Sequence, residues 1–162
     1  DHPDAGYNQR MMDLQGALGS AQMDRAKEIV LERQNLAQRY DEAFDELVWL
    51  RTPFKHSDYE HGYQSYPCLF TPREVSPSSI EEINSKRNEL MDELQKKGIS
   101  TRPATHAVHM LSFYKEKYNL LAIDFPNAYA ADHCSISLPL FHGMTKEEQD
   151  FVIKTVKKKY IQ

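Results

Sequence analysis

Donor-rich side chains gather just before an expected helix near the start of the chain. Residues 6–10 read Gly-Tyr-Asn-Gln-Arg, so two amides and a guanidinium precede that helix. The backbone N–H groups of a helix start carry a partial positive charge, and with such side chains they can bind an anion such as phosphate. The same residue types also cap helices, so capping remains the alternative role.

A second group of polar and aromatic side chains lies between residues 98 and 114. It contains Arg102, His106, His109 and Tyr114. A guanidinium, two imidazoles and a phenol suit a phosphorylated or polyhydroxylated ligand, because they offer charged, titratable and aromatic groups in one loop. Two histidines at this spacing are also compatible with a metal ion, but neither an HExxH pattern nor an evident cysteine and carboxylate set completes a site. We predict no metal site, and ordinary loop histidines remain the alternative.

The sequence contains none of the common motifs of self-contained catalysis. It has no GxSxG elbow, no P-loop and no GxGxxG fingerprint, and the sequence identifies no partner for Cys68. We therefore predict that this chain contributes binding residues to an active site but no catalytic residue.

The charge pattern argues against a nucleic-acid partner. The 20 basic and 24 acidic residues are scattered along the chain and give a formal net charge of −4. Such a pattern provides no broad positive surface. The run Lys157, Lys158 and Lys159 suits a solvated helix end, where cations offset the partial negative charge of the backbone.

Cysteine usage and the absence of long apolar runs bear on the compartment. Cys68 and Cys134 form neither a CxxC motif nor a disulfide framework, so we expect both to be reduced and the protein to be cytoplasmic. No apolar run approaches the roughly 20 residues that a membrane-spanning helix needs, and residues 1–4 lack the pattern of a secretory signal. Because the first residue is Asp1 and not Met, we expect the chain to begin inside a longer protein.

Length and periodicity predict one α/β domain with a single core. The chain has 162 residues, of which 40% are hydrophobic. Gly16 and Gly19 weaken the first part of a helical pattern over residues 13–47, and Asp24 can cap a new helix, so we expect two consecutive helices with a bend near Met23. The longer helix is predicted to place one stripe against the core: Ala26, Ile29, Val30, Arg33, Ala37, Tyr40, Phe44 and Leu47.

The middle of the chain predicts a strand between two loops, followed by a helix. Residues 49–62 and 71–79 are typical of loops, and Pro67 places the strand over 63–70 at a sheet edge or on a bulge. Ser79 and Glu82 fit a capping box, and Gly98 ends the helix that follows. The buried face of this helix is predicted to be Ile80, Ile83, Arg87, Leu90 and Leu94.

The last third of the chain predicts further short elements. A strand over 99–102 leads into a polar and aromatic connection over 103–126, then a helix opened by Pro126 that runs to residue 133, and a strand over 135–140. Thr145 and Glu148 form a second capping box. The helix after it is predicted to bury Phe151, Val152 and Val156.

Four segments in sequence order resemble one known family. GYNQRMMDLQGALGSAQMDR resembles the signature GYN-x-R-M-x-DLQ-A-A-x-G-x-x-Q of the pyridoxal-phosphate-dependent nucleotide-sugar aminotransferases of the DegT/StrS type, a branch of the fold-type I aminotransferases. ERQNLAQRYDEAF resembles the family's R-x-x-x-A-x-x-Y helix, and KKGISTRPATHAVHMLSFY resembles its G-I-x-T-R … H … Y substrate loop. FPNAYAADHCSISLPLFHGMTKEEQDFVIKTVKK is similar to the closing stretch of the family.

The resemblance implies that the chain is the C-terminal part of a protein about twice as long. Its fold would be the α/β small domain of fold-type I aminotransferases, with a short, mostly antiparallel sheet packed against helices. Residues 1–23 would link from the missing large, cofactor-binding domain, and residues 24–162 would form the small domain. The family's Schiff-base lysine, its aspartate at the pyridine nitrogen and its stacking aromatic all lie upstream, so this chain should be inactive alone.

The resemblance also implies roles for individual residues. Asn8 matches the asparagine that reaches the cofactor phosphate across the homodimer, and Arg10 matches the neighbouring arginine. His109 and Tyr114 match the histidine and tyrosine of the substrate loop. His106 would be an additional substrate contact, with Arg102 a further candidate. This chain departs from the family where Gln9 replaces an aromatic and where residues 104–106, Ala-Thr-His, replace Y-x-P; these departures bear on which sugar is bound.

The function implied by the resemblance is transamination of a sugar. With pyridoxal phosphate, the complete protein would transfer an amino group from an amino acid, expected to be glutamate, to a keto sugar linked to a nucleotide. A sugar dehydratase is the alternative, because some relatives replace the lysine with histidine and keep this domain. A non-catalytic interaction module is a third possibility.

Overall fold

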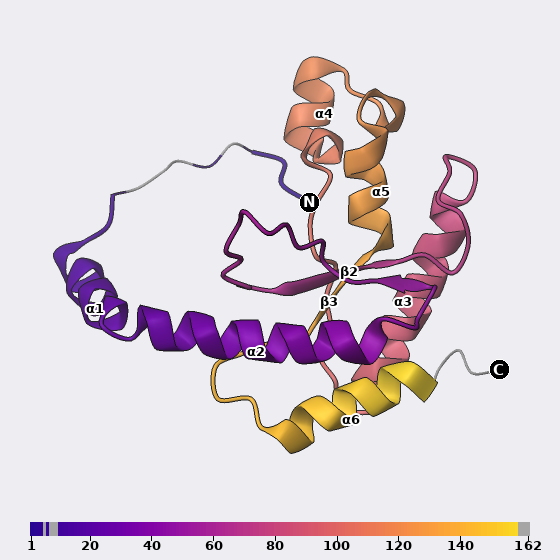
Figure 1. Cartoon of the computed structure of the whole chain (residues 1–162). Helices are drawn as coiled ribbons and strands as arrows, with labels where there is room; N and C mark the ends of the chain where they lie inside the picture. Colours follow the sequence, from indigo (N-terminus) through magenta and orange to yellow (C-terminus); the bar gives the residue numbers. More distant parts are fainter. Residues whose placement is uncertain (5, 7–9, 159–162) are drawn as a thin grey trace.

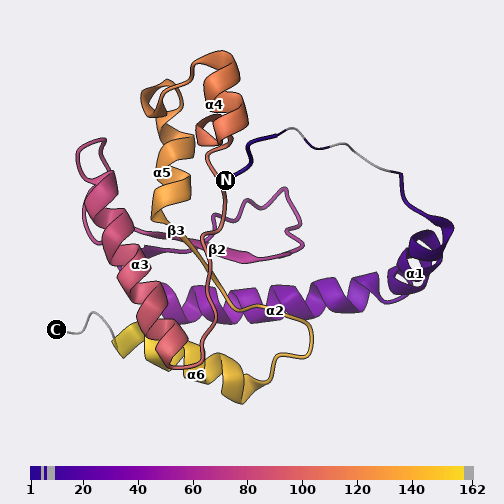
Figure 2. The ribbon, with the colours of Figure 1, turned by 180° about the vertical axis from the view of Figure 1, so that it is seen from behind.

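The longest helix, α2 (Ala26–Phe44), runs across the molecule, with a small sheet on one side and helix α6 (Lys146–Lys157) along another (Figure 1). The computed structural model describes residues 1–4, 6 and 10–158. Helices α3 (Ile80–Lys96) and α5 (Pro126–Cys134) lie on the far side of the sheet from α2, and Figure 2 shows them from behind. A shorter helix, α4 (Ser112–Tyr118), stands beside α5 and away from α2.

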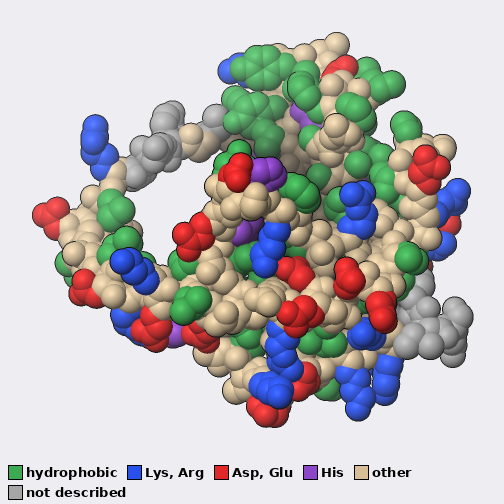
Figure 3. All heavy atoms as spheres, viewed as in Figure 1, with side chains coloured by type: hydrophobic (Ala, Val, Ile, Leu, Met, Phe, Trp, Pro, Cys, Tyr) green, Lys and Arg blue, Asp and Glu red, His purple; other side chains and the backbone are tan. Residues whose placement is uncertain are grey.

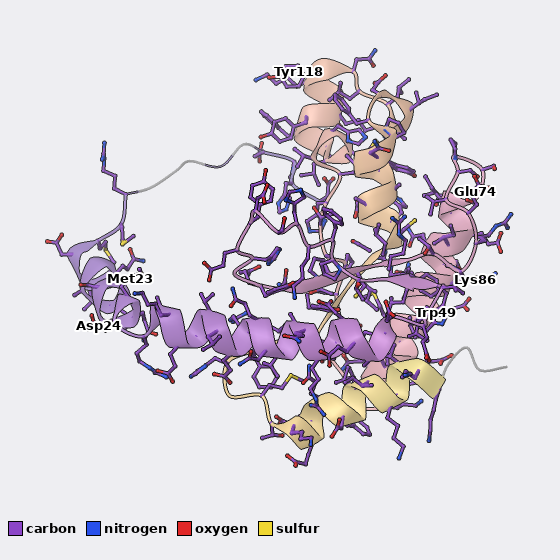
Figure 4. The ribbon with its side chains drawn as sticks, viewed as in Figure 1. Met23, Asp24, Trp49, Glu74, Lys86 and Tyr118 are labelled. Carbon is purple, nitrogen blue, oxygen red and sulfur yellow. The ribbon has the colours of Figure 1, made fainter. Side chains whose placement is uncertain are left out.

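The two consecutive helices predicted at the start are confirmed. Helix α1 (Asp13–Met23) ends at the predicted bend, and Figure 4 labels Met23 and Asp24 at the junction with α2. Asp24 is not the N-cap that we predicted: it is the C-cap of α1, and its backbone is helical (φ −60°, ψ −27°). The N-cap of α2 is Arg25, which makes no capping bond with its side chain.

The predicted stripe of α2 faces the core. Ala37, Tyr40 and Phe44 are buried, and the other members of the stripe are half-buried. The hydroxyl of Tyr40 donates a hydrogen bond to the carbonyl of Pro139 over 2.8 Å. A buried phenol needs such a partner, since an unpaired hydroxyl in the core is costly. Through this hydrogen bond, the buried ring of Tyr40 also holds the segment that follows β3 against α2.

The sheet has three antiparallel strands in the order β1 (Leu50–Arg51), β2 (Tyr66–Phe70), β3 (Ser135–Leu138). Strand β1 lies inside the stretch 49–62 that we predicted as loop. The expected strand over 99–102 is wrong: this segment makes one isolated bridge, from Arg102 to Ser137. In that bridge the Ser137 N–H donates to the Arg102 carbonyl, so the segment pairs with β3 at one residue and forms no strand ladder.

Pro67 lies on the central strand, contrary to the edge position that we predicted. It stands opposite Ser137 on β3. Because the Ser137 N–H points to Arg102 and away from β2, this pair does not need an amide hydrogen from the proline. On the other side, β1 pairs only with Leu69 and Phe70 and leaves Pro67 unopposed. Although Pro67 lies on the central strand, no ladder hydrogen bond requires an amide hydrogen at this position, as would be true at a sheet edge.

The segment between β1 and β2 folds back onto α2. Arg33 donates to the carbonyls of Tyr63 and Gln64, at 2.8 and 3.1 Å, and Gln34 donates to the carbonyl of His61 at 3.1 Å. Tyr63 is buried and has a left-handed backbone (φ 44°), which is costly for a bulky residue. The bonds from α2 hold this conformation in place.

The predicted helix faces are mostly confirmed. The five predicted residues of α3 are buried, as are Val152 and Val156 of α6, but Phe151 is 51% exposed and its predicted burial is wrong. Helix α3 ends at Lys96, two residues before Gly98, whose φ of 78° suits glycine just past a helix end. Helix α5 begins at Pro126 as predicted. The connection 103–126 contains α4 and two short 3₁₀ helices, η1 (Val108–Met110) and η2 (Ala122–Asp124).

One predicted capping box forms and the other does not. At α6, the Glu148 N–H donates to the Thr145 hydroxyl (3.2 Å) and the Thr145 N–H donates to the Glu148 carboxylate (2.8 Å). At α3, the Ser79 hydroxyl bonds to the preceding loop. It accepts a hydrogen bond from the Ser76 N–H and donates one to the Glu74 carbonyl, both at 2.8 Å. The Ser79 hydroxyl therefore bonds to backbone groups of the preceding loop and does not cap the first turn of α3.

Candidate substrate site and cofactor segment

A cavity of about 440 Å³ lies between α4, η1 and the start of α5. It brings together His106, His109 and Tyr114, three of the residues predicted to bind substrate. Their roles remain predictions, but the structure places their side chains around one space. Tyr118 and Phe125 also line the cavity and were not singled out from the sequence. Figure 3 shows hydrophobic side chains gathered over α4, and Figure 4 labels Tyr118 on this helix.

His109 is the most enclosed polar side chain of this cavity. It lies on η1, is 7% exposed, and packs against Phe125 with 5.1 Å between the ring centroids. The turn is anchored from α5, since the Ala107 N–H donates to the Asp132 carboxylate over 3.0 Å. Among the described residues, Nε2 of His109 has no hydrogen-bond partner. Because a buried polar atom without a partner is costly, this enclosed nitrogen is an unsatisfied group in the wall of the cavity.

Tyr114 and Tyr118 form an aromatic pair on one face of α4. They are four residues apart, so a helix brings them to the same side. Their ring centroids are 6.5 Å apart and the rings are nearly parallel, at 12°. The spacing of these two tyrosines is visible in the sequence and would have identified Tyr118 once residues 112–118 were predicted to be helical.

The start of α4 is fixed by the first residues of the chain. The Asp1 carboxylate accepts hydrogen bonds from the Ser112 backbone N–H, at 2.9 Å, and from the Ser112 hydroxyl. The Phe113 N–H reaches the His2 carbonyl at 3.4 Å. The N-terminal segment therefore contacts the predicted substrate loop directly, which no pattern in the sequence indicated.

Arg102 is not among the residues that line this cavity. It lines a separate hollow of about 310 Å³ beside β3, together with Thr101, Ser137 and Gln64. Its position there follows from the backbone bridge to Ser137. The structure thus groups the two histidines and Tyr114 but sets Arg102 apart from them.

The predicted cofactor segment is described only in part. Asn8 lies outside the described residues, and Arg10 is exposed three residues before α1. The Met12 N–H at the start of α1 donates to the Gln15 side chain over 3.0 Å. A guanidinium can pair with a phosphate group, so the charge of Arg10 is compatible with the cofactor contact that the resemblance implies, and this role stays a prediction.

The described part of the chain offers neither a metal cluster nor a membrane-spanning helix. Residues 1–4, 6 and 10–158 contain no cluster of three or more histidine, cysteine, aspartate or glutamate side chains arranged to hold a metal ion. Within the same ranges, none of the helices combines the length and the apolar character that crossing a membrane requires.

Comparison with known proteins gives a consistent family. Residues 1–157 match the model of the DegT/DnrJ/EryC1/StrS aminotransferase family. The chain is 31% identical over 152 residues to the spore coat polysaccharide biosynthesis protein SpsC of Bacillus subtilis, covering 94% of this chain and 37% of that protein. It is 28% identical over 159 residues to GDP-perosamine synthase of Escherichia coli O157:H7, covering 98% of this chain and 39% of that protein.

A solved structure shows the same fold. The putative sugar aminotransferase Spr1654 from Streptococcus pneumoniae superimposes with a TM-score of 0.77 at 25% identity, over 91% of this chain and 35% of that one. It has been solved in apo, PLP and PMP forms. The predicted fold class, an α/β small domain of fold-type I aminotransferases with a short antiparallel sheet, is confirmed. The chain spans well under half the length of the relatives it matches.

Proposed function

The chain belongs to the DegT/DnrJ/EryC1/StrS aminotransferase family, whose members act on sugars with pyridoxal phosphate, and we propose that it forms the substrate-binding small domain of such an enzyme. The complete enzyme would move an amino group from an amino acid, glutamate in our proposal, to a keto sugar linked to a nucleotide. Residues 24–162 would be the small domain and residues 1–23 the link from the large domain.

The observation that supports this proposal best is the cavity beside α4. It gathers His106, His109 and Tyr114, and the buried Nε2 of His109 has no partner among the described residues. These groups can hold hydroxyl, carbonyl or phosphate oxygens of a substrate in one orientation. In this proposal they bind and orient the substrate and take no part in proton transfer.

The cofactor contact would come from the segment before α1. Pyridoxal phosphate, when bound, supplies an electron sink for the exchange of an amino group. Arg10 would hold its phosphate together with Asn8, which we propose to reach across a homodimer. In this proposal the chain would not transaminate alone, since the lysine that carries the cofactor would lie in another part of the complete enzyme.

The test uses the complete parent protein with pyridoxal phosphate and ¹⁵N-glutamate. With a nucleotide-linked keto sugar as acceptor, we expect ¹⁵N in the amino group of the nucleotide-linked amino sugar that forms, while the glutamate is converted to 2-oxoglutarate. Asn8→Ala should weaken cofactor retention by about 1–3 kcal/mol, the cost of removing a partner from a buried charged group. Arg10→Met should act in the same direction, and the exposed Arg73→Met on the opposite part of the fold serves as the control.

Two outcomes would contradict the proposal. Loss of water from the sugar without transfer of nitrogen would identify a dehydratase. A parent protein that binds no pyridoxal phosphate would favour the non-catalytic module.

A further inference from the structure

Arg87 is a charged side chain in the interior of the domain. It lies on α3, is 4% exposed, and its Nε has no hydrogen-bond partner among the described residues. An arginine is rarely buried this far, because taking its charge out of water is costly. A buried cation that leaves one of its donors unpaired adds little to stability by itself, so its contacts indicate what it does in the fold.

The guanidinium of Arg87 bonds to the end of α5. Its Nη1 donates to the carbonyl of Ser135 at 2.7 Å and, more weakly, to that of Asp132 at 3.4 Å. Its Nη2 donates to the side-chain carbonyl of Asn84 at 3.2 Å. The last carbonyls of a helix have no partner within the helix and carry a partial negative charge, which a cation offsets. Arg87 therefore holds the junction between α5 and β3.

The carbonyl of Ser135 is open to this contact because it points away from the sheet. The Ser137 N–H bonds to Arg102 and not to β2, and backbone groups two residues apart on a strand point to the same side. Ser135 therefore also turns its backbone away from β2, toward α3, which lies beside α5 and β3 (Figure 2). Arg87 thus satisfies a carbonyl that β2 leaves unpaired.

The residues that Arg87 holds by their carbonyls also hold the loop around His106 by their side chains. The Asp132 carboxylate accepts a hydrogen bond from the Ala107 N–H at 3.0 Å. The Ser135 hydroxyl accepts one from the Ala104 N–H at 3.1 Å. These two amides lie on either side of His106, and η1 begins directly after the second of them. The loop is therefore fixed at both ends to the junction that α3 holds.

We propose that Arg87 is a positioning residue of the predicted substrate loop: it fixes the backbone of Asp132 and Ser135, and their side chains fix the loop on both sides of His106. Arg87 does not line the cavity beside α4, so it acts only through these two residues. The inference rests on the proposed function only for the role of the loop in substrate binding. The connection itself consists of hydrogen bonds within this chain.

The experiment measures amide hydrogen exchange of the 162-residue chain by NMR. Arg87→Met removes the donors and the buried charge, and replacing a buried charge with an apolar side chain of similar size often leaves a fold intact. Exchange at Ala104 and Ala107 should rise about tenfold relative to the amides of α6, as expected for the loss of a bond to a charged group. The α6 amides report global opening. Arg73→Met, at an exposed arginine, is the control and should leave both loop amides unchanged.

Two further variants separate the two arms of the connection. Asp132→Ala should speed exchange at Ala107 and not at Ala104, whereas Ser135→Ala should do the reverse. Asp132→Asn keeps an acceptor oxygen and should restore most of the protection at Ala107. Asp92→Ala, at an exposed acidic residue of α3, is the matched control. A general loss of packing would speed exchange at both amides together.

Arg87→Lys decides the matter if Arg87→Met does not fold. Lysine keeps the buried cation, but its compact ammonium cannot reach both carbonyls as the planar guanidinium does. Exchange at Ala104 and Ala107 should therefore exceed that of the parent chain while the α6 amides change little. Unchanged exchange at both loop amides in Arg87→Lys, or acceleration only in step with α6, would overturn the inference.

Kinetics of the complete parent protein separate this inference from the proposed function. Arg87→Lys should raise the KM for the keto sugar more than it lowers kcat, because it loosens residues that bind substrate in our proposal. Faster exchange at the loop amides with an unchanged KM would leave the role of Arg87 in place and would remove His106 from the substrate site.

Discussion

The carboxylate of Asp1 accepts a hydrogen bond from the backbone N–H of Ser112, 2.9 Å away and 111 residues further along the chain. This contact joins the segment that leads to Arg10 with the helix that carries Tyr114. If both proposed roles hold, one bond connects the cofactor segment with the substrate cavity. The position of α4 then depends on where the N-terminal segment lies.

Removal of the Asp1 carboxylate should loosen α4. In Asp1→Ala the Ser112 N–H loses its acceptor, and the loss of a capping group costs about 0.5–2 kcal/mol. We expect faster hydrogen exchange at Ser112 and Phe113 and little change in α2. Asp4→Ala is the control. Equal exchange rates in the two variants would show that the contact does not hold the helix.

The capping box of α6 gives a sharper stability prediction. Thr145→Ala removes the acceptor of the Glu148 N–H and should lower the free energy of unfolding by about 1 kcal/mol, measured by urea denaturation. Thr145→Ser keeps the hydroxyl and should remain close to the parent. If serine and alanine destabilise equally, the hydroxyl is not the cause.

The buried phenol of Tyr40 should contribute through its hydroxyl as well as its ring. Tyr40→Phe leaves the Pro139 carbonyl without this donor and should cost about 1–3 kcal/mol of unfolding free energy. Tyr59→Phe, at an exposed tyrosine, should change stability by less than about 0.5 kcal/mol. Denaturation of both variants under one set of conditions gives the comparison.

The two thiols should be unreactive in the folded chain. Burial raises the pKa of Cys68 and of Cys134, so little thiolate is present near neutral pH. Since the folded pKa values are raised, the stability that the protonated thiols contribute is complete below the unfolded value of about 8.5 and declines as the pH rises above it. We expect slow reaction with a disulfide reagent at pH 8 and rapid reaction of both thiols in urea. Rapid reaction of the native chain would contradict the burial of these side chains.

Sequence patterns predicted the elements that repeat a regular signal. The stripe of α2 and the face of α3 extend over several turns, so one irregular residue does not hide them. Strand β1 has only two residues, too few to show alternation. The capping prediction failed at Ser79 and held at Thr145 because the loop before Ser79 offers competing backbone groups. Phe151 is exposed although its spacing fits the buried face.

The candidate site was predictable where its residues are close in sequence. His106, His109 and Tyr114 lie within one loop and line one cavity. Phe125 reaches the same cavity from the end of η2, and the contact of Asp1 with Ser112 joins the two ends of a long stretch of chain. No local pattern encodes such contacts, since they depend on how α4 and α5 pack together.

Pro67 also limits how far its neighbouring strand can grow. If β1 continued in the register of Leu50 with Phe70, Pro53 would stand opposite Pro67, and two residues without an amide hydrogen would face each other. The hairpin cannot lengthen past that point, so the following residues must leave the sheet and fold over α2. Two imino acids far apart in sequence thus free a stretch of chain for surface contacts, and replacing both would favour a longer hairpin in its place.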